Sequence, residues 1–436
     1  MAMSTQTEQA RAAERDEVLS KATAAKQVAP TLATLPTSAK DALLCDAADK
    51  LIARADDILE ANRKDIEAGR ANAMSESLVD RLALDQGRIE SIAGGLRQVA
   101  DLEDPVGVIV QGGVMANGIQ MKQVRVPLGV MGMVYEARPN VTVDAFGLAI
   151  KSGNVALLRG SSTAVHSNTK LVEILQEVAA SHELPRAIVQ LLPCQSHDSV
   201  QDLVTARGLV DVVIPRGSAR LINAVVTDAT VPTIETGTGN CHFYIDKDAE
   251  LDSAIEMLLN GKTRRVSVCN ATETVLLDSA LADDAKAQVL RALQDAGVTI
   301  HGEKDQLEAL GVEGRGVEGI IQAEEADWAD EYLSFDIAAA IVDGVEGAIA
   351  HIAQWSSGHT DAIASHNAYT LQKFANEVDS AAVMLNASTA FTDGEQYGMG
   401  AEIGISTQKL HARGPMALPE LTSTKWILEG TGHTRP

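Results

Sequence analysis

The sequence is poor in aromatic residues, in positive charge and in long apolar runs. Aromatic residues make up only 3% of the 436 residues, too few for the stacking surfaces that bind single-stranded nucleic acid. The 60 acidic residues outnumber the 36 basic ones, and the formal net charge is −24. DNA and anionic membranes are therefore poor partners. No stretch reaches the roughly 18 apolar residues of a transmembrane helix. We expect no nucleic-acid partner and no membrane partner, and an anionic substrate would need a local basic pocket.

Cysteines are also few, and none is paired in the sequence. The four are Cys45, Cys194, Cys241 and Cys269. The absence of a CxxC pair suits free thiols in a reducing cytoplasm. Met1–Lys21 is polar and mixed in charge, so it does not read as a secretory signal, and we expect a cytoplasmic location. Cys241 and His242 are adjacent and no second pair completes a site, so we expect no metal.

The glycine pattern G-x-G-x-x-G of dinucleotide-binding proteins is absent as well. Two other turns connect a predicted strand to a predicted helix, at 160–163 and at 216–218. The first amides of a helix are free to bind an anion, and Arg159 and Arg216 stand beside these turns. Together the two turns suit a nucleotide phosphate, whereas each turn taken singly favours an ordinary strand-to-helix connection.

The order of apolar patterns predicts an α/β protein. Residues 1–16 are polar and we expect them to be frayed, while 18–94 have the apolar spacing of helices. Residues 106–127 predict an exposed hairpin, which suits either subunit contact or plain solvent exposure. From Gly129 onward, strands alternate with helices, as in parallel sheets. A second α/β domain follows over roughly 234–390.

The stretch 261–270 presents one cysteine among several cations. Cys269 follows Lys262, Arg264 and Arg265 and precedes Asn270. Nearby positive charge lowers the pKa of a thiol, and the thiolate is the nucleophilic form. A buried cysteine beside a basic loop is the other interpretation.

Two further groups of polar residues have open interpretations. Lys409, His411 and Arg413 form a cationic cluster that could hold an anionic substrate or could be a solvated loop. Glu235 could be a catalytic base or a surface carboxylate.

Several long segments resemble the γ-glutamyl phosphate reductase branch of the aldehyde dehydrogenase superfamily. These segments are Val126–Thr142, Val213–Ser218, Ile234–His242, Ser267–Thr274, Asn386–Thr389 and Gly404–Met416. The resemblance runs from about residue 20 to the C-terminus. It implies an aldehyde-dehydrogenase-like fold with two Rossmann-like α/β domains and an oligomerisation hairpin.

The resemblance also implies how the chain is divided. The cofactor-binding domain comprises residues 1–105, with an N-terminal helical layer, and 128–233. The oligomerisation hairpin and tail comprise 106–127 and 413–436. The catalytic domain that carries the nucleophilic cysteine comprises 234–412.

The activity implied by the resemblance is the NADPH-dependent reduction of L-glutamyl 5-phosphate to L-glutamate 5-semialdehyde in proline biosynthesis. Phosphate is released and the acyl group passes through a thioester on Cys269. One alternative is an ordinary aldehyde dehydrogenase that oxidises an aldehyde to an acid. Another is a non-enzymatic partner that channels an acyl phosphate from the upstream kinase. Arg159 and Arg216, beside the two strand-to-helix turns at 160–163 and 216–218, favour NADP over NAD.

Roles for individual residues follow from the same resemblance. Cys269 is the nucleophile, Asn140 the oxyanion-hole amide, and Glu235 matches the water-activating glutamate of hydrolytic relatives. The cofactor-binding residues are Arg159, Gly160, Ser161, Gly217, Ser218 and Glu331. The substrate-binding residues are Arg138, Lys262, Arg264, Arg265, Asn270, Lys409, His411 and Arg413.

The chain departs from the family pattern at two positions. Val266 stands where proline is frequent, which bears on the rigidity of the cysteine loop. Ala390 stands where arginine is frequent, which bears on substrate contact. We also expect a homo-oligomer built through 106–127 and a last strand near 424–428, and a transient contact with glutamate 5-kinase.

Overall fold

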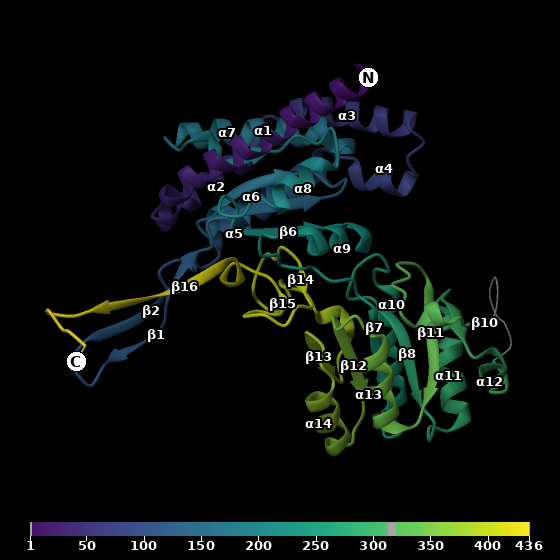
Figure 1. Ribbon diagram of the computed structural model, residues 1–436. Coiled ribbons are helices and arrows are strands. Elements are labelled where there is room, and N and C mark those ends of the chain that lie inside the picture. The colour runs from purple at the N-terminus through teal and green to yellow at the C-terminus, as the bar shows by residue number, and fades with distance from the viewer. Residues whose placement is uncertain (1, 313–319, 436) are drawn as a thin grey trace. The chain divides into compact units, whose positions relative to one another are not determined.

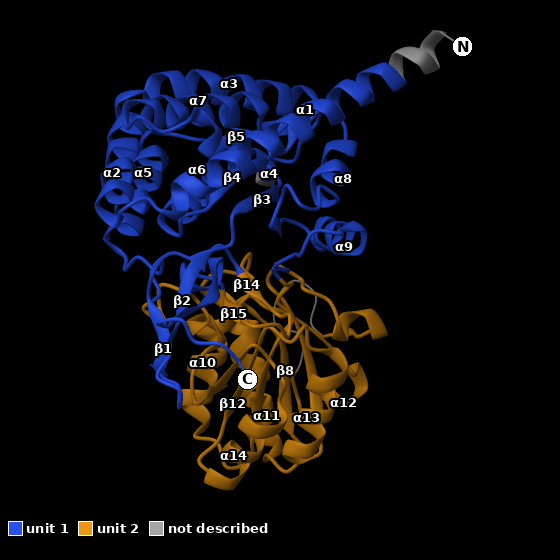
Figure 2. Cartoon of the chain, turned by 60° about the vertical axis from the view of Figure 1, so that its left-hand side comes forward, with its two compact units in different colours: residues 1–236, 399–404, 416–436 blue, residues 237–398, 405–415 orange. Residues whose placement is uncertain are grey.

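The computed structural model describes residues 2–312 and 320–435. Figure 1 shows its helices and strands. The chain forms two compact units (Figure 2). Unit 1 comprises Met1–Thr236, Met399–Gly404 and Met416–Pro436, and unit 2 comprises Gly237–Gly398 and Ile405–Pro415. Each unit contains a parallel sheet with helices, and unit 1 adds an antiparallel sheet, so the predicted α/β class with a hairpin element is confirmed.

Unit 1 begins with a layer of helices. They are α1 (Ala2–Ala33), α2 (Thr37–Ala53), α3 (Ala55–Ala71), α4 (Glu76–Leu82) and α5 (Gln86–Asp101). The prediction that residues 1–16 are frayed is wrong for the described part, because α1 already begins at Ala2. The helix is anchored within its first half, at Glu14. The Glu14 carboxylate accepts hydrogen bonds from the Ser196 amide at 3.1 Å and hydroxyl at 2.6 Å.

The parallel sheet of unit 1 has the strand order β5-β4-β3-β6. Its strands are β3 (Val130–Tyr135), β4 (Val155–Arg159), β5 (Val189–Leu191) and β6 (Val212–Arg216). The connecting helices are α6 (Pro139–Lys151), α7 (Val165–Ser181), α8 (Asp198–Val204) and α9 (Ala219–Asp228), with short 3-10 turns η1 (Ser162–Ala164) and η2 (Arg186–Ile188). The strands are almost wholly buried, which explains their continuous apolar runs. The order reverses between β3 and β6, and ligands of such sheets bind beyond the carboxyl ends at that point.

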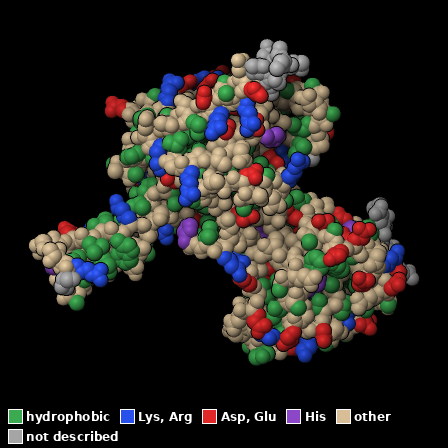
Figure 3. Space-filling view, viewed as in Figure 1, with side chains coloured by type: hydrophobic (Ala, Val, Ile, Leu, Met, Phe, Trp, Pro, Cys, Tyr) green, Lys and Arg blue, Asp and Glu red, His purple; other side chains and the backbone are tan. Residues whose placement is uncertain are grey.

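A three-stranded antiparallel sheet completes unit 1. It joins β1 (Ile109–Val114), β2 (Gln120–Pro127) and β16 (Thr422–Glu429) in the order β1-β2-β16. A 3-10 turn, η5 (Pro419–Leu421), precedes β16. Apolar side chains gather on this sheet in the space-filling view (Figure 3). The exposed ones are Val108, Ile109, Val110, Val114, Met115, Trp426 and Leu428.

Unit 2 is built on a seven-stranded parallel sheet of order β10-β9-β11-β8-β7-β12-β13. The strands are β7 (Cys241–Ile245), β8 (Thr272–Asp278), β9 (Thr299–Gly302), β10 (Ile320–Gln322), β11 (Asp336–Val342), β12 (Thr360–Ala364) and β13 (Ala382–Leu385). The helices are α10 (Leu251–Thr263), α11 (Asp283–Asp295), α12 (Lys304–Glu308), α13 (Gly344–Trp355) and α14 (Ala368–Glu377), with 3-10 turns η3 (Glu325–Trp328) and η4 (Thr389–Phe391). A small ladder joins β14 (Ile405–Ser406) to β15 (Gly414–Pro415).

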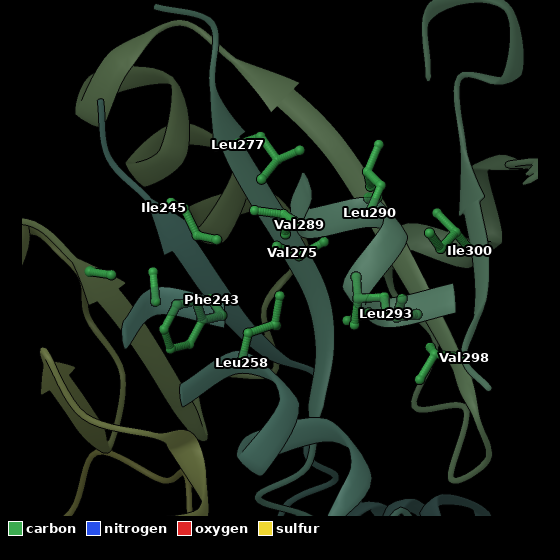
Figure 4. Close-up of a cluster of buried hydrophobic side chains, with 14 of the residues drawn as sticks. Phe243, Ile245, Leu258, Val275, Leu277, Val289, Leu290, Leu293, Val298 and Ile300 are labelled. Atoms are coloured by element: carbon green, nitrogen blue, oxygen red, sulfur yellow. The ribbon is translucent and has the colours of Figure 1, made fainter. Parts of the chain in front are cut away.

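Side chains of the central strands point alternately into two hydrophobic cores, one on each face of this sheet. Phe243, Val275 and Leu277 lie in one core with Leu258 of α10 and Leu290 of α11 (Figure 4). Tyr244, which follows Phe243, and Leu276, which lies between Val275 and Leu277, belong to the other core. Residues of α13 and α14 also contribute to that core. Because both faces are covered, polar residues can be exposed for chemistry only at the strand ends.

Candidate active site

Cys269 lies in the loop between α10 and β8, at the amino end of the sheet of unit 2. It is partly buried and forms no disulfide. The Cys241 thiol donates a hydrogen bond to the Cys269 carbonyl oxygen at 3.2 Å. The Gly239 backbone packs on the same carbonyl, because a Cβ built on Gly239 would lie 1.5 Å from that oxygen. The backbone of Cys269 is thus fixed from two sides.

The residues after Cys269 tie the loop to the segment around η4. The Asn270 side-chain amide donates to the Thr392 carbonyl at 3.0 Å and to the Ala390 carbonyl at 3.3 Å. The Thr272 and Thr389 hydroxyls are 3.0 Å apart. The side-chain amide of Asn270, a residue predicted to bind substrate, therefore anchors the loop. The contact at Ala390 uses the backbone and does not depend on the side chain at that position.

The predicted cations beside Cys269 have different environments. Lys262 is fully buried, and its ammonium lies 2.5 Å from Glu273 Oε2. Arg264 and Arg265 are exposed, and neither forms an ion pair with another described residue. These two guanidiniums are available to an anionic substrate, whereas the ammonium of Lys262 faces the protein interior.

The C-terminal basic cluster also lies in unit 2. Lys409 and Arg413 both form ion pairs with Asp379, and Arg413 Nη1 lies 2.8 Å from that carboxylate. His411 is exposed. A substrate anion at this cluster would compete with Asp379 for the two cations.

Glu331 contacts Gly239, whose backbone packs on the Cys269 carbonyl. Its Oε1 accepts a hydrogen bond from the Gly239 amide at 2.8 Å. Burial raises the pKa of the Glu331 carboxyl above its ordinary value, and the Gly239 hydrogen bond opposes this shift. The structure thus brings Cys269, Asn270 and Glu331 together within unit 2.

The other predicted catalytic residues belong to unit 1. Asn140 is in the first turn of α6, and its amide nitrogen donates to Asp144 Oδ2 at 3.1 Å. Arg138 precedes that helix. Glu235 is half-buried in the segment after α9. The Asn140 hydrogen bond to Asp144, one turn further along α6, sets the orientation of the amide.

The turn between β6 and α9 binds an anionic group of the chain itself. Glu136 accepts hydrogen bonds from the Ser218 amide at 3.1 Å and from its hydroxyl at 2.8 Å. A Cβ on Gly217 would lie 2.8 Å from the Glu136 carboxyl carbon. This turn stands at the strand-order reversal and leaves no room for a side chain at Gly217. The amide and hydroxyl of Ser218 are therefore arranged to bind an anion, which in this structure is the Glu136 carboxylate.

The turn after β4 has a different character. The buried Arg159 guanidinium donates to the Ser196 carbonyl at 2.6 Å and to the Ser199 hydroxyl at 3.1 Å. A Cβ on Gly160 would lie 2.3 Å from the Asn168 amide nitrogen, so this glycine is required by packing. The Ser161 hydroxyl accepts from the Thr163 amide at 3.2 Å. Arg159 therefore braces the neighbouring loop, and any contact with a cofactor would add to that role.

Several residues that the structure places at the site are not predicted from the sequence. Gly239 and Cys241 contact the Cys269 backbone, Glu273 pairs with Lys262, and Glu136 accepts hydrogen bonds at the turn between β6 and α9. The sequence alone gives no indication that Cys241 contacts Cys269. Within the described residues, no three His, Cys, Asp or Glu side chains form a group suited to a metal ion. None of the described helices has both the length and the apolar character to cross a bilayer.

Comparison with known proteins defines the class to which this site belongs. The model of the aldehyde dehydrogenase family matches residues 2–308. The chain therefore belongs to the aldehyde dehydrogenase family, and its predicted class, an oxidoreductase that acts on aldehydes, is confirmed. Enzymes of this family use nicotinamide cofactors.

Two solved structures are similar over nearly the whole chain. The γ-glutamyl phosphate reductase of Thermotoga maritima is 41% identical with a TM-score of 0.93, covering 96% of this chain and 100% of that one. The γ-glutamyl phosphate reductase of Saccharomyces cerevisiae is 30% identical with a TM-score of 0.52, covering 96% and 98%. They confirm the predicted resemblance to this branch. A glyceraldehyde-3-phosphate dehydrogenase of Methanocaldococcus jannaschii complexed with NADP shares the fold at 18% identity and a TM-score of 0.65, covering 95% and 94%.

Proposed function

We propose that the protein reduces L-glutamyl 5-phosphate to L-glutamate 5-semialdehyde with NADPH and releases phosphate, as a step of proline biosynthesis. The observation that carries the proposal is the fixed nucleophile loop, in which Gly239 and Cys241 hold the Cys269 carbonyl. Support comes from the 41% identity to a γ-glutamyl phosphate reductase.

The chemistry begins at the Cys269 sulfur. The thiolate attacks the acyl carbon of the substrate, the carbon–sulfur bond forms, and the bond to the phosphate oxygen breaks as phosphate leaves with its electron pair. The negative charge on the carbonyl oxygen needs donors while the carbon is tetrahedral. We assign these to the Asn140 amide and the Cys269 backbone N–H, and one such donor is typically worth about 3–4 kcal/mol. The product of this step is a thioester on Cys269.

The residues that would hold the cofactor are Gly217, Ser218 and Glu331, with Arg159, Gly160 and Ser161 at the neighbouring turn. When bound, NADPH supplies a hydride to the acyl carbon. Ser218 already binds a carboxylate through its amide and hydroxyl, so an incoming phosphate would displace Glu136. Collapse of the thiohemiacetal then expels the Cys269 thiolate and frees the aldehyde.

Substrate charge is assigned to the exposed cations. Arg264 and Arg265 have no ion-pair partner among the described residues and stand next to the nucleophile in sequence, so we assign them to the phosphate. Arg138, Lys409, His411 and Arg413 are the candidates for the amino-acid carboxylate. Hydrolysis would waste the thioester, so Glu235 is assigned to structure or to proton transfer, not to water activation.

The experiment that tests this proposal is the reverse reaction with and without phosphate. Glutamate semialdehyde and NADP⁺ should yield NADPH only when phosphate is present, because phosphate is the acceptor of the acyl group. Propionaldehyde, which lacks the charged end of the substrate, is the control and should react poorly. Phosphate-independent formation of NADPH would instead establish an ordinary aldehyde dehydrogenase that hydrolyses the thioester.

The partners of the enzyme are also proposed. The apolar residues of the β1–β2–β16 sheet support a homo-oligomer, because several of them are more than half exposed in a single chain, such as Val114 at 72%. Transient contact with glutamate 5-kinase and a cytoplasmic location stay predictions.

A further inference from the structure

Lys262 and Glu273 form an ion pair inside unit 2. Both side chains are 0% exposed, and Nζ lies 2.5 Å from Oε2. Lys262 is in the last turn of α10, and Glu273 is the second residue of β8. Removing two charges from water costs free energy, and a pair of apolar residues at the same place often gives equal or greater stability than an ion pair. Stability alone therefore does not explain this pair. The contacts that the pair makes therefore indicate what it does.

Both members of the pair contact the turn that carries Glu331. The Leu333 amide donates to Glu273 Oε1 at 3.4 Å. The Lys262 ammonium lies 5.9 Å from the centre of the Tyr332 ring, within range of a cation–π interaction. The two oxygens of Glu273 are thus divided between Lys262 and the backbone of the turn.

The backbone of this turn is strained. Leu333 has a φ of +54°, a region that residues with a side chain rarely occupy. Its side chain is 39% exposed, so packing of the leucine does not hold this conformation. Strained backbone persists only where surrounding contacts impose it. The hydrogen bond to Glu273 is such a contact.

The same turn is connected to the nucleophile. Glu331 accepts a hydrogen bond from the Gly239 amide at 2.8 Å, and Gly239 packs directly on the Cys269 carbonyl. Contacts therefore run without a gap from the buried pair, through Leu333 and Glu331, to Gly239 and Cys269.

We propose that Lys262 and Glu273 are positioning residues, which hold the strained 331–333 turn so that Glu331 is aimed at the cofactor ribose and supports Gly239 behind the nucleophile. This inference rests on the proposed function for the role of Glu331. It adds a second task, the support of Cys269, that requires neither substrate nor cofactor.

The electrostatics of the pair agree with this role. Burial raises the pKa of Glu273 to about 7, and Lys262 opposes the shift. Burial also lowers the pKa of Lys262. Glu331 faces the carboxyl of Glu273, while Asp336 and Cys241 face Lys262. As pH falls below about 7, the Glu273 carboxyl takes up a proton and the ion pair is lost, so the hold on the turn weakens.

The test uses Glu273→Gln, alone and combined with Leu333→Gly. Two quantities are measured on the purified full-length enzyme: the rate at which iodoacetamide alkylates Cys269 without cofactor, as a function of pH, and the Kd for NADPH. We expect Glu273→Gln to change both by about tenfold, since a misplacement of about 1 Å can cost about 100-fold in rate. The alkylation profile should also lose its inflection near pH 7. Leu333→Gly should restore part of both effects, because glycine adopts a positive φ without strain.

The matched control is the buried pair of Lys40 and Asp104 in unit 1, with side chains 1% and 7% exposed. Asp104→Asn should lower the melting temperature without changing alkylation or NADPH binding. If Glu273→Gln behaves in the same way, the inference is overturned. If Glu273→Gln does not fold, Glu273→Asp retains the charge, withdraws from Leu333 and is judged by the same two quantities. Alkylation needs no substrate, so these outcomes are independent of whether the enzyme requires phosphate.

Discussion

At the residue scale, Gly239 has the closest contact to an added Cβ among the described glycines. A Cβ there would lie 1.5 Å from the Cys269 carbonyl oxygen and 2.3 Å from its carbon. This contact is with backbone, which cannot rotate away as a side chain could. Gly239→Ala should therefore displace the nucleophile loop and reduce kcat by about 100-fold or more, as measured by steady-state NADPH formation.

Gly95→Ala is the control for that substitution. Gly95 lies within α5, and a Cβ there would meet nothing within 4 Å. Alanine is the better helix former, so this variant should keep full activity and gain about 0.5–1 kcal/mol in stability. Retention of wild-type kcat in Gly239→Ala would show that the loop is not held as described.

His359 makes the stability of unit 2 sensitive to acid. Its ring is fully buried, with Nδ1 2.8 Å from the Thr360 hydroxyl and 3.8 Å from the Cys241 sulfur. Burial lowers the pKa of His359 to about 4, opposed by Asp361. The unfolded chain takes up the proton near pH 6.5. The contribution of His359 to stability is therefore complete above about pH 6.5 and is lost as pH falls towards 4.

We expect the free energy of unfolding to decrease over this range, with His359 contributing up to about 1.4 kcal/mol per pH unit. In His359→Gln, which cannot titrate, the decrease should be correspondingly shallower. Urea unfolding monitored at several pH values between 4 and 7 measures both slopes. Equal slopes in the two proteins would contradict the assignment.

Residue patterns predicted which side chains are present at the site, but not which way they point. Lys262, Arg264 and Arg265 form one cationic run in the sequence. The structure separates them, because Lys262 is still in α10 and points inward to Glu273, whereas the two arginines follow the helix in an exposed loop. The partner of Lys262 lies on a strand, and no local pattern indicates that the two meet.

At the element scale, the strands were the most predictable features. Buried parallel strands are continuous apolar runs, and 273–277 and 338–342 lie within β8 and β11. The start of α1 was not predictable, because its anchor is the hydrogen bonding of Glu14 to Ser196, which is distant in sequence. Positive-φ turns at non-glycine residues, such as Leu333, also leave no trace in a propensity pattern.

The β1–β2–β16 sheet carries the element-scale prediction. Val114 on β1 and Leu428 on β16 are 72% and 55% exposed. If the sheet is an interface between copies of this chain, Val114→Glu with Leu428→Glu should reduce the mass seen by light scattering to that of one chain. Burying two carboxylates in an apolar interface is unfavourable.

The control for the interface prediction is Tyr369→Glu on α14, where the side chain is 76% exposed. This variant should leave the assembly intact. A single-chain mass for the unmodified protein would refute the prediction outright, and an unchanged mass in the double variant would place the interface elsewhere.

At the scale of the whole molecule, the chain leaves unit 1 and returns to it. Residues 399–404 and 416–436 belong to unit 1, while 405–415 belong to unit 2. The last return is fixed by the antiparallel ladder of β16 on β2, in which Trp426 pairs with Gln123. Pairing between such distant segments depends on contacts that composition and periodicity do not encode. Similarity to known enzymes supports the proposed activity, and the structure shows the backbone contacts that hold Cys269.

The most direct measurement of the central claim is the phosphate-dependent reverse reaction of Cys269→Ala beside Cys45→Ala. Cys45 is an exposed residue of α2 in unit 1, so its replacement should leave NADPH formation from glutamate semialdehyde, NADP⁺ and phosphate unchanged. Cys269→Ala should lose at least about 1,000-fold in kcat, because alanine removes the sulfur to which the acyl group is proposed to be transferred. Activity that survives in Cys269→Ala would mean that the loop held by Gly239 and Cys241 is not the catalytic centre.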